Sequence, residues 1–200
     1  MIDLGPATTE LVRLVRGVRD DQLGGRTPCG DLTVGDLLDH LDGLSAAFTA
    51  AARKVSPDVG VPRPTPDESR LGDGWRDRLP RRLAGLAAAW RDEDAWTGTT
   101  RVGGVDLPGH ATGMAAIEEL VVHGWDLAVS TGQDFTCDPE SRDAADRYVR
   151  EIVAEHPDGS PELFGPPVPV PEDAAPLDRL IGLTGRDPAW RPDRDGAGAT

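Results

Sequence analysis

Glu119 and His123 are the residues whose types and spacing most clearly allow chemistry. They are four positions apart in an apolar stretch, and this spacing places two side chains on one face of a helix. His40 lies in a second apolar stretch. One carboxylate and two imidazoles form a His₂Glu set, which leaves a coordination position of a divalent metal open. Spacing alone does not bring His40 to the pair, so a solvated Glu–His pair and a satisfied core histidine are the alternatives.

Two aspartates are placed to orient these imidazoles. Asp36 precedes His40 by four residues, and Asp126 follows His123 by three. Metal-bound histidines commonly donate their second ring N–H to a carboxylate, which fixes the ring. Asp36 could equally cap a helix, and Asp126 could lie on a solvated face.

Other residues with reactive or charged groups have simpler interpretations. His110 is a weak ligand candidate, because three helical turns separate it from His123. His156 is expected at a helix C-terminus, where an imidazolium suits the helix dipole. For Cys29 we expect burial rather than nucleophilic chemistry. Arg186 stands in a Gly-Arg-Asp-Pro turn, where a salt link is the default expectation.

The elements that must position these residues are nearly all helical. Apolar residues recur at helical spacing in several segments, and Thr33 with Asp36 has the arrangement of a capping box. A weakly alternating stretch with Gly103-Gly104 predicts a short hairpin or an irregular crossover at 97–107, and the prolines in 56–70 predict a loop. The expected helices cover residues 7–23, 33–55, 72–92, 110–130, 139–156 and 176–183. These segments predict an all-α bundle.

Composition narrows the function classes. A formal net charge of −14 argues against binding to nucleic acid or to an anionic membrane surface, since both need a basic footprint. The sequence has no long apolar run and no secretory signal, which predicts a cytoplasmic protein with two free thiols. We expect one domain over residues 1–190, a disordered tail at 191–200, and a monomer or homodimer.

Three segments resemble a known family. Residues 27–41 are similar to the T-P-C-x-D-W-T-V-x-D-L-L-x-H-L signature of DinB-like metal-binding proteins from actinobacteria. These proteins belong with the N-terminal domain of mycothiol-dependent maleylpyruvate isomerase. Residues 119–133 resemble that family's E-x-x-x-H-G-W-D-L-A-x-x-T-G-Q motif, and residues 176–188 resemble its closing segment. Leu32 departs from the usual tryptophan of the first signature, which is expected to change a pocket wall.

The resemblance implies a DinB-like four-helix bundle with an extended C-terminal segment. It also implies a divalent metal held by His40, Glu119 and His123. Zinc suits this ligand set best, with nickel, iron and manganese as alternatives. Maleylpyruvate isomerase has an additional C-terminal domain that contributes to its substrate site. This chain ends near the bundle, so we do not expect it to share that activity.

The function expected from this resemblance is that of a metal-dependent enzyme. It would use a low-molecular-weight thiol, by resemblance mycothiol, for S-transfer or isomerisation of a small electrophile. Two alternatives stay open: a non-catalytic metal- or small-ligand-binding bundle, and a metal-dependent hydrolase.

Overall fold

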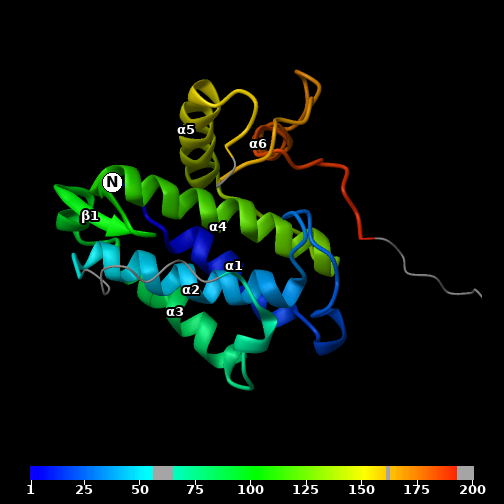
Figure 1. The fold of residues 1–200 in the computed structure, drawn as a ribbon, viewed down its shortest axis with the longest axis horizontal. Coiled ribbons are helices and arrows are strands. Elements are labelled where there is room, and N and C mark those ends of the chain that lie inside the picture. The colour runs from blue at the N-terminus through cyan, green and yellow to red at the C-terminus, as the bar shows by residue number, and fades with distance from the viewer. Residues whose placement is uncertain (56–64, 161–162, 193–200) are drawn as a thin grey trace, which may run out of the picture.

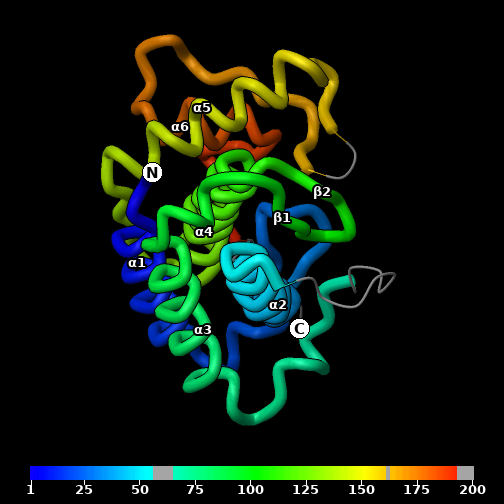
Figure 2. Tube along the Cα trace, turned by 90° about the vertical axis from the view of Figure 1, so that its left-hand side faces the viewer, coloured from blue at the N-terminus to red at the C-terminus, as the bar shows by residue number. Residues whose placement is uncertain are grey.

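Four helices form the core of the molecule in the computed structural model, which describes residues 1–55, 65–160 and 163–192. They are α1 (Gly5–Gly17), α2 (Val34–Ala52), α3 (Trp75–Ala89) and α4 (Gly109–Thr131). Both α1 and α2 pack against α3 and α4, which closes the bundle (Figure 2). The predicted helical bundle is therefore confirmed.

The remaining elements lie outside this bundle. Helix α5 (Pro139–Glu155) packs on α4, and α6 (Pro176–Leu183) packs on α5 (Figure 1). Strands β1 (Thr99–Val102) and β2 (Val105–Pro108) pair antiparallel, with Thr99 opposite Pro108, so the predicted hairpin is confirmed. Short 3₁₀ turns complete the described elements: η1 (Asp20–Gln22), η2 (Glu68–Arg70) and η3 (Glu93–Trp96).

Local sequence signals explain where several helices begin and end. Thr33 Oγ1 accepts a hydrogen bond from the Asp36 amide at 3.1 Å, and Asp36 Oδ2 accepts one from the Thr33 amide at 3.0 Å. This capping box fixes the start of α2. At the same end of the bundle, Gly132 terminates α4 with a φ of 69°, a conformation that glycine adopts at little cost.

A tryptophan pair anchors the end of α3 against α4. The fully buried Trp90 donates its indole N–H to the Phe48 carbonyl at 3.2 Å, and Trp96 donates to the Trp90 carbonyl at 2.8 Å. The two rings meet edge to face with centroids 5.1 Å apart. A Cβ at Gly113 of α4 would lie 2.5 Å from the Trp96 ring, so glycine is needed for this close approach.

Some boundaries differ from the predictions. The first helix ends at Gly17 rather than near residue 23, because Val18 is extended (ψ 130°) and a separate turn follows at Asp20–Gln22. The third helix starts only at Trp75 and contains Pro80. Most of the predicted loop at 56–70, namely residues 56–64, lies outside the described residues, as do 193–200 of the predicted tail.

In the part of the chain that is described, no helix combines the length and apolarity needed to cross a bilayer.

Candidate metal centre

The pairing of α2 with α4 brings the three predicted ligands together. His40 lies in the second turn of α2, and Glu119 and His123 lie in the middle of α4. Their donor atoms all lie within 4.8 Å of one another. The two imidazole rings are nearly perpendicular (83°), with centroids 4.8 Å apart. The cluster thus joins two helices of the bundle, while the role of its members as metal ligands stays a prediction.

One carboxylate oxygen is shared between the two imidazoles. Glu119 Oε2 is 3.0 Å from Nε2 of His123 and 3.4 Å from Nε2 of His40. The side chains of His123, Glu119 and His40 are only 10%, 14% and 16% exposed. The three donor atoms therefore meet in a partly closed space with limited access to water.

The other ring nitrogen of His123 is held by a buried ion pair. Its Nδ1 lies 2.9 Å from Oδ2 of Asp126, which is completely buried. Arg186, from the segment after α6, donates to both oxygens of Asp126, from Nε to Oδ1 at 2.8 Å and from Nη2 to Oδ2 at 2.9 Å. Because an ionised carboxylate only accepts hydrogen bonds, Nδ1 of His123 must carry the proton.

This proton assignment shows that the cluster fits a cation. In neutral His123 the proton on Nδ1 leaves a lone pair on Nε2, which faces the lone pairs of Glu119 Oε2 at 3.0 Å. Such a contact is repulsive unless a positive charge lies between the two atoms. A proton on His123 or a divalent metal would supply that charge, and the donor set suits zinc.

The pKa values at the centre have the same physical basis. Burial alone would raise the pKa of Glu119, but hydrogen bonds from His123 and His40 hold it well below the usual range. Burial alone would lower the pKa of His123, but hydrogen bonds with Asp126, Cys29 and Glu119 raise it well above its ordinary value. The charge of Arg186 keeps the pKa of the buried Asp126 low. Without a metal, the centre therefore favours an imidazolium beside a carboxylate.

Asp36 does not take the orienting role considered for it. Its Oδ2 bonds to Thr33, and its Oδ1 accepts the amide of Glu68 at 2.9 Å. Its two oxygens thus bond to the helix cap and to the amide of Glu68 rather than to His40.

The other histidines lie in other surroundings. His110 is exposed and lies beside Trp96, with ring centroids 6.1 Å apart. His156 is exposed at the C-cap of α5, the helix-end position expected for it.

Three residues near the centre were not assigned to it from the sequence. Cys29 is half-buried, and its Sγ lies within 4.8 Å of donor atoms of His123 and Asp126. Glu118, which is not one of the clustered ligands, is buried, and burial together with the charge of Glu119 raises its pKa to about 8. For Arg186 the sequence predicted only a salt link, without naming its partner. Cys29 and Arg186 stand in segments that resemble family motifs, which was the available signal.

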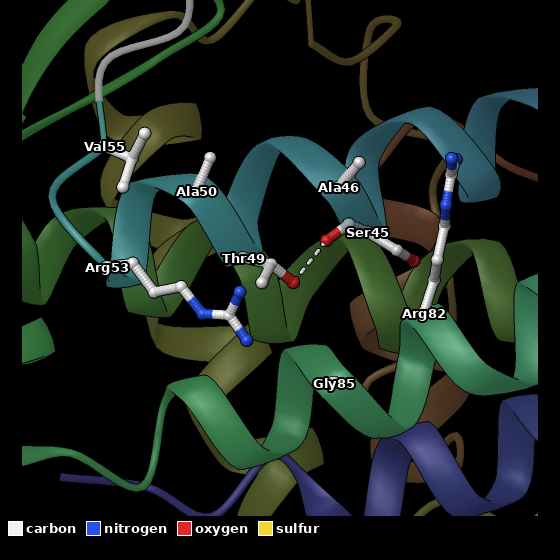
Figure 3. Close-up of a pocket in the computed structure, with 8 residues that line it drawn as sticks. All are labelled: Ser45, Ala46, Thr49, Ala50, Arg53, Val55, Arg82 and Gly85. Carbon is white, nitrogen blue, oxygen red and sulfur yellow. Dashed lines mark hydrogen bonds between the residues drawn. The ribbon is translucent and has the colours of Figure 1, made fainter.

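A separate groove lies between α2 and α3. It encloses about 320 Å³, and Arg53 and Arg82 lie at its two ends (Figure 3). Small residues of α2 and α3 also line it, and the Thr49 hydroxyl there donates to the Ser45 carbonyl at 2.6 Å. None of the three cluster residues lines this groove.

Comparison with known families decides the relationship of this chain. Residues 4–128 match the family model described as the mycothiol maleylpyruvate isomerase N-terminal domain. The chain belongs to this family. The matched residues include α1 to α3, all but the last turn of α4 and all three residues of the cluster, whereas Arg186 lies beyond them.

The chain is also similar to curated proteins and to solved structures. The uncharacterized proteins MT0763 and Rv0738 of Mycobacterium tuberculosis are each 28% identical over 174 residues, covering 86% of this chain and 90% of theirs. The crystal structure of the mycothiol-dependent maleylpyruvate isomerase matches with a TM-score of 0.57 and 20% identity, over 74% of this chain. A mutant of that isomerase matches with a TM-score of 0.58 and 19% identity. This chain spans 65% of the length of the isomerase chain, and the likeness shows a shared fold.

Proposed function

We propose that this protein is a metal-dependent enzyme that uses a low-molecular-weight thiol, of the mycothiol class, on a small electrophile. The reaction would be S-transfer or thiol-dependent isomerisation. The observation that carries the proposal is the meeting of two imidazole nitrogens and one carboxylate oxygen around a point that needs a positive charge. Membership of a family named after a mycothiol-dependent isomerase supports the thiol.

The roles of the chain's own residues follow from their contacts. His40 and His123 would bind a divalent metal through Nε2, and Glu119 through Oε2. Asp126 would hold the His123 ring by its Nδ1–H. When bound, a divalent metal lowers the pKa of a coordinated thiol and so supplies a thiolate at neutral pH. Three protein ligands leave a position for that thiol.

Metal binding is the first test. Protein purified without a histidine tag should contain about one divalent ion per chain, as expected for a single three-ligand site. His123→Ala should lose most of this metal, whereas His110→Ala should retain it, since His110 is an exposed histidine on the same helix. Full metal occupancy in a His40→Ala, His123→Ala double variant would contradict the assignment.

Thiol binding and turnover form the second test. Cobalt-substituted protein should develop a sulfur-to-metal charge-transfer band when mycothiol is added. Consumption of an electrophilic test substrate should then depend on both the metal and the thiol. Glu119→Gln should weaken both signals, because it removes the negative charge that faces the two imidazoles.

The outcomes separate the candidate functions. A metal spectrum that no thiol perturbs would instead indicate a non-catalytic binding bundle. Equal hydrolysis of esters or amides with and without thiol would indicate a hydrolase. Either result would refute the thiol-dependent function while leaving the metal site intact.

A further inference from the structure

The segment after α6 returns to the interior of the bundle. Its residue Arg186 is only 7% exposed, and its Nη1 donates to the Thr184 carbonyl at 3.2 Å. Gly185 adopts a φ of 77°, and a Cβ there would lie 2.9 Å from the backbone of Gly165. Glycine therefore allows the sharp turn that directs the Arg186 side chain inward.

The contacts of Arg186 fix both oxygens of Asp126. Two parallel N–H···O bonds of 2.8 and 2.9 Å hold the carboxylate, a fork geometry in which neither oxygen can turn away without losing a bond. Oδ2 also accepts the Nδ1–H of His123 at 2.9 Å. A continuous chain of bonds thus runs from the C-terminal segment to Nε2 of His123, which faces Glu119.

We propose that Arg186 is a positioning residue of the metal centre, which acts through Asp126 to fix the ring orientation and tautomer of His123. The segment after α6 therefore sets the affinity of the bundle for its metal, although it lies outside the residues that match the family model. This inference rests on the metal site of the proposed function and is independent of the thiol chemistry.

The alternative is a purely structural ion pair that attaches the C-terminal segment to the bundle. That role predicts a change in stability with no change in metal affinity among folded molecules. Positioning predicts weaker metal binding by correctly folded protein, because hydrogen-bond partners of metal-bound histidines typically contribute about 10–100-fold to affinity.

The zinc affinity of the full chain distinguishes the positioning role of Arg186 from a purely structural one. It is measured by competition with a chromophoric chelator on protein whose folding has been verified by circular dichroism. Arg186→Lys keeps the positive charge but loses the two-point fork, and should weaken zinc binding by about 10-fold. Arg179→Lys is the matched control, since Arg179 lies on α6 and donates to the carbonyls of Glu172 and Ala174. Its zinc affinity should be unchanged.

A double-mutant cycle tests the route through Asp126. Asp126→Asn alone should weaken zinc binding by about 10–100-fold. Adding Arg186→Lys to Asp126→Asn should cause little further loss, because the carboxylate through which Arg186 acts is already gone. Additive effects would overturn the proposal. If the lysine variant does not fold, Arg186→Gln replaces it with the same expectations.

A spectroscopic readout reports directly on the ring. In zinc-loaded wild-type protein, the Nδ1–H of His123 should give a slowly exchanging, downfield proton resonance. Arg186→Lys should broaden this resonance or shift it upfield, and Arg179→Lys should not. Wild-type zinc affinity with an unchanged resonance in folded Arg186→Lys would overturn the proposal. Failure of the wild-type protein to bind zinc would instead refute the metal site of the proposed function.

Discussion

Replacing Glu118 by glutamine should stabilise the metal-free protein in a pH-dependent manner. Glu118 is only 5% exposed, and burial together with the neighbouring charge of Glu119 raises its pKa from 4.5 to about 8. The folded state therefore binds a proton that the unfolded state releases above pH 4.5. The free energy of unfolding must then fall as the pH rises between these two values.

The size of the effect follows from the two pKa values. Each pH unit in this window costs about 1.4 kcal/mol, so the full difference approaches about 5 kcal/mol above pH 8. Glutamine is uncharged and close to a protonated glutamate in shape. Glu118→Gln should therefore exceed the wild-type stability by less than about 1 kcal/mol at pH 5 and by about 3 kcal/mol at pH 7, and the gain should level off near 5 kcal/mol above pH 8.

Urea unfolding at pH 5, 6, 7, 8 and 9, followed by circular dichroism in the presence of a chelator, measures this difference. The control is Glu140→Gln on α5, where the side chain is exposed and the change should stay within about 0.5 kcal/mol at every pH. A stability difference that does not vary with pH, or that is largest at pH 5, would refute the reasoning.

Three further changes test the metal and the scaffold. Chelation should lower the thermal midpoint of unfolding, since a metal at a concentration of 100 times its Kd stabilises the folded state by about 2.7 kcal/mol. An unchanged melting curve after confirmed metal removal would count against a site that joins two helices. Gly113→Ala should cost about 1–3 kcal/mol in urea unfolding, because its Cβ would lie 2.5 Å from the Trp96 ring; wild-type stability would show that the ring moves freely. Thr33→Ala should cost about 1 kcal/mol by removing the cap of α2, and a loss below 0.3 kcal/mol would argue that Asp36 alone suffices.

The helices and the in-helix pairs of the centre were predictable from the sequence, because both depend on local spacing. The period of the apolar residues predicted the bundle, and the four-residue spacing placed Glu119 beside His123. The three-residue spacing likewise placed Asp126 within reach of His123. These relations involve single helices, whose geometry is nearly independent of the rest of the fold.

Contacts between distant segments could not be predicted from periodicity. His40 and Glu119 are 79 residues apart, and only the family resemblance suggested that they meet. Burial of Glu118 depends on how α5 and the C-terminal segment cover α4, which spacing does not specify. Spacing also leaves the role of Asp36 open, because its position suits both a helix cap and a hydrogen-bond partner for an imidazole. In the folded protein its carboxylate accepts the amide of Glu68 in addition to its cap bonds.

The Asp126–Arg186 ion pair also constrains how the protein folds during its own synthesis. The two residues are 60 positions apart, so at about 5–20 residues per second Arg186 leaves the ribosome roughly 3–12 s after Asp126. Throughout that interval the carboxylate has no guanidinium to neutralise it, and burying it charged would be costly. Until Arg186 arrives, a buried Asp126 can be neutralised only by the imidazolium of His123 or by its own protonation. A nascent chain stalled before Arg186 would therefore lack the ion pair that completes the surroundings of Asp126 and His123.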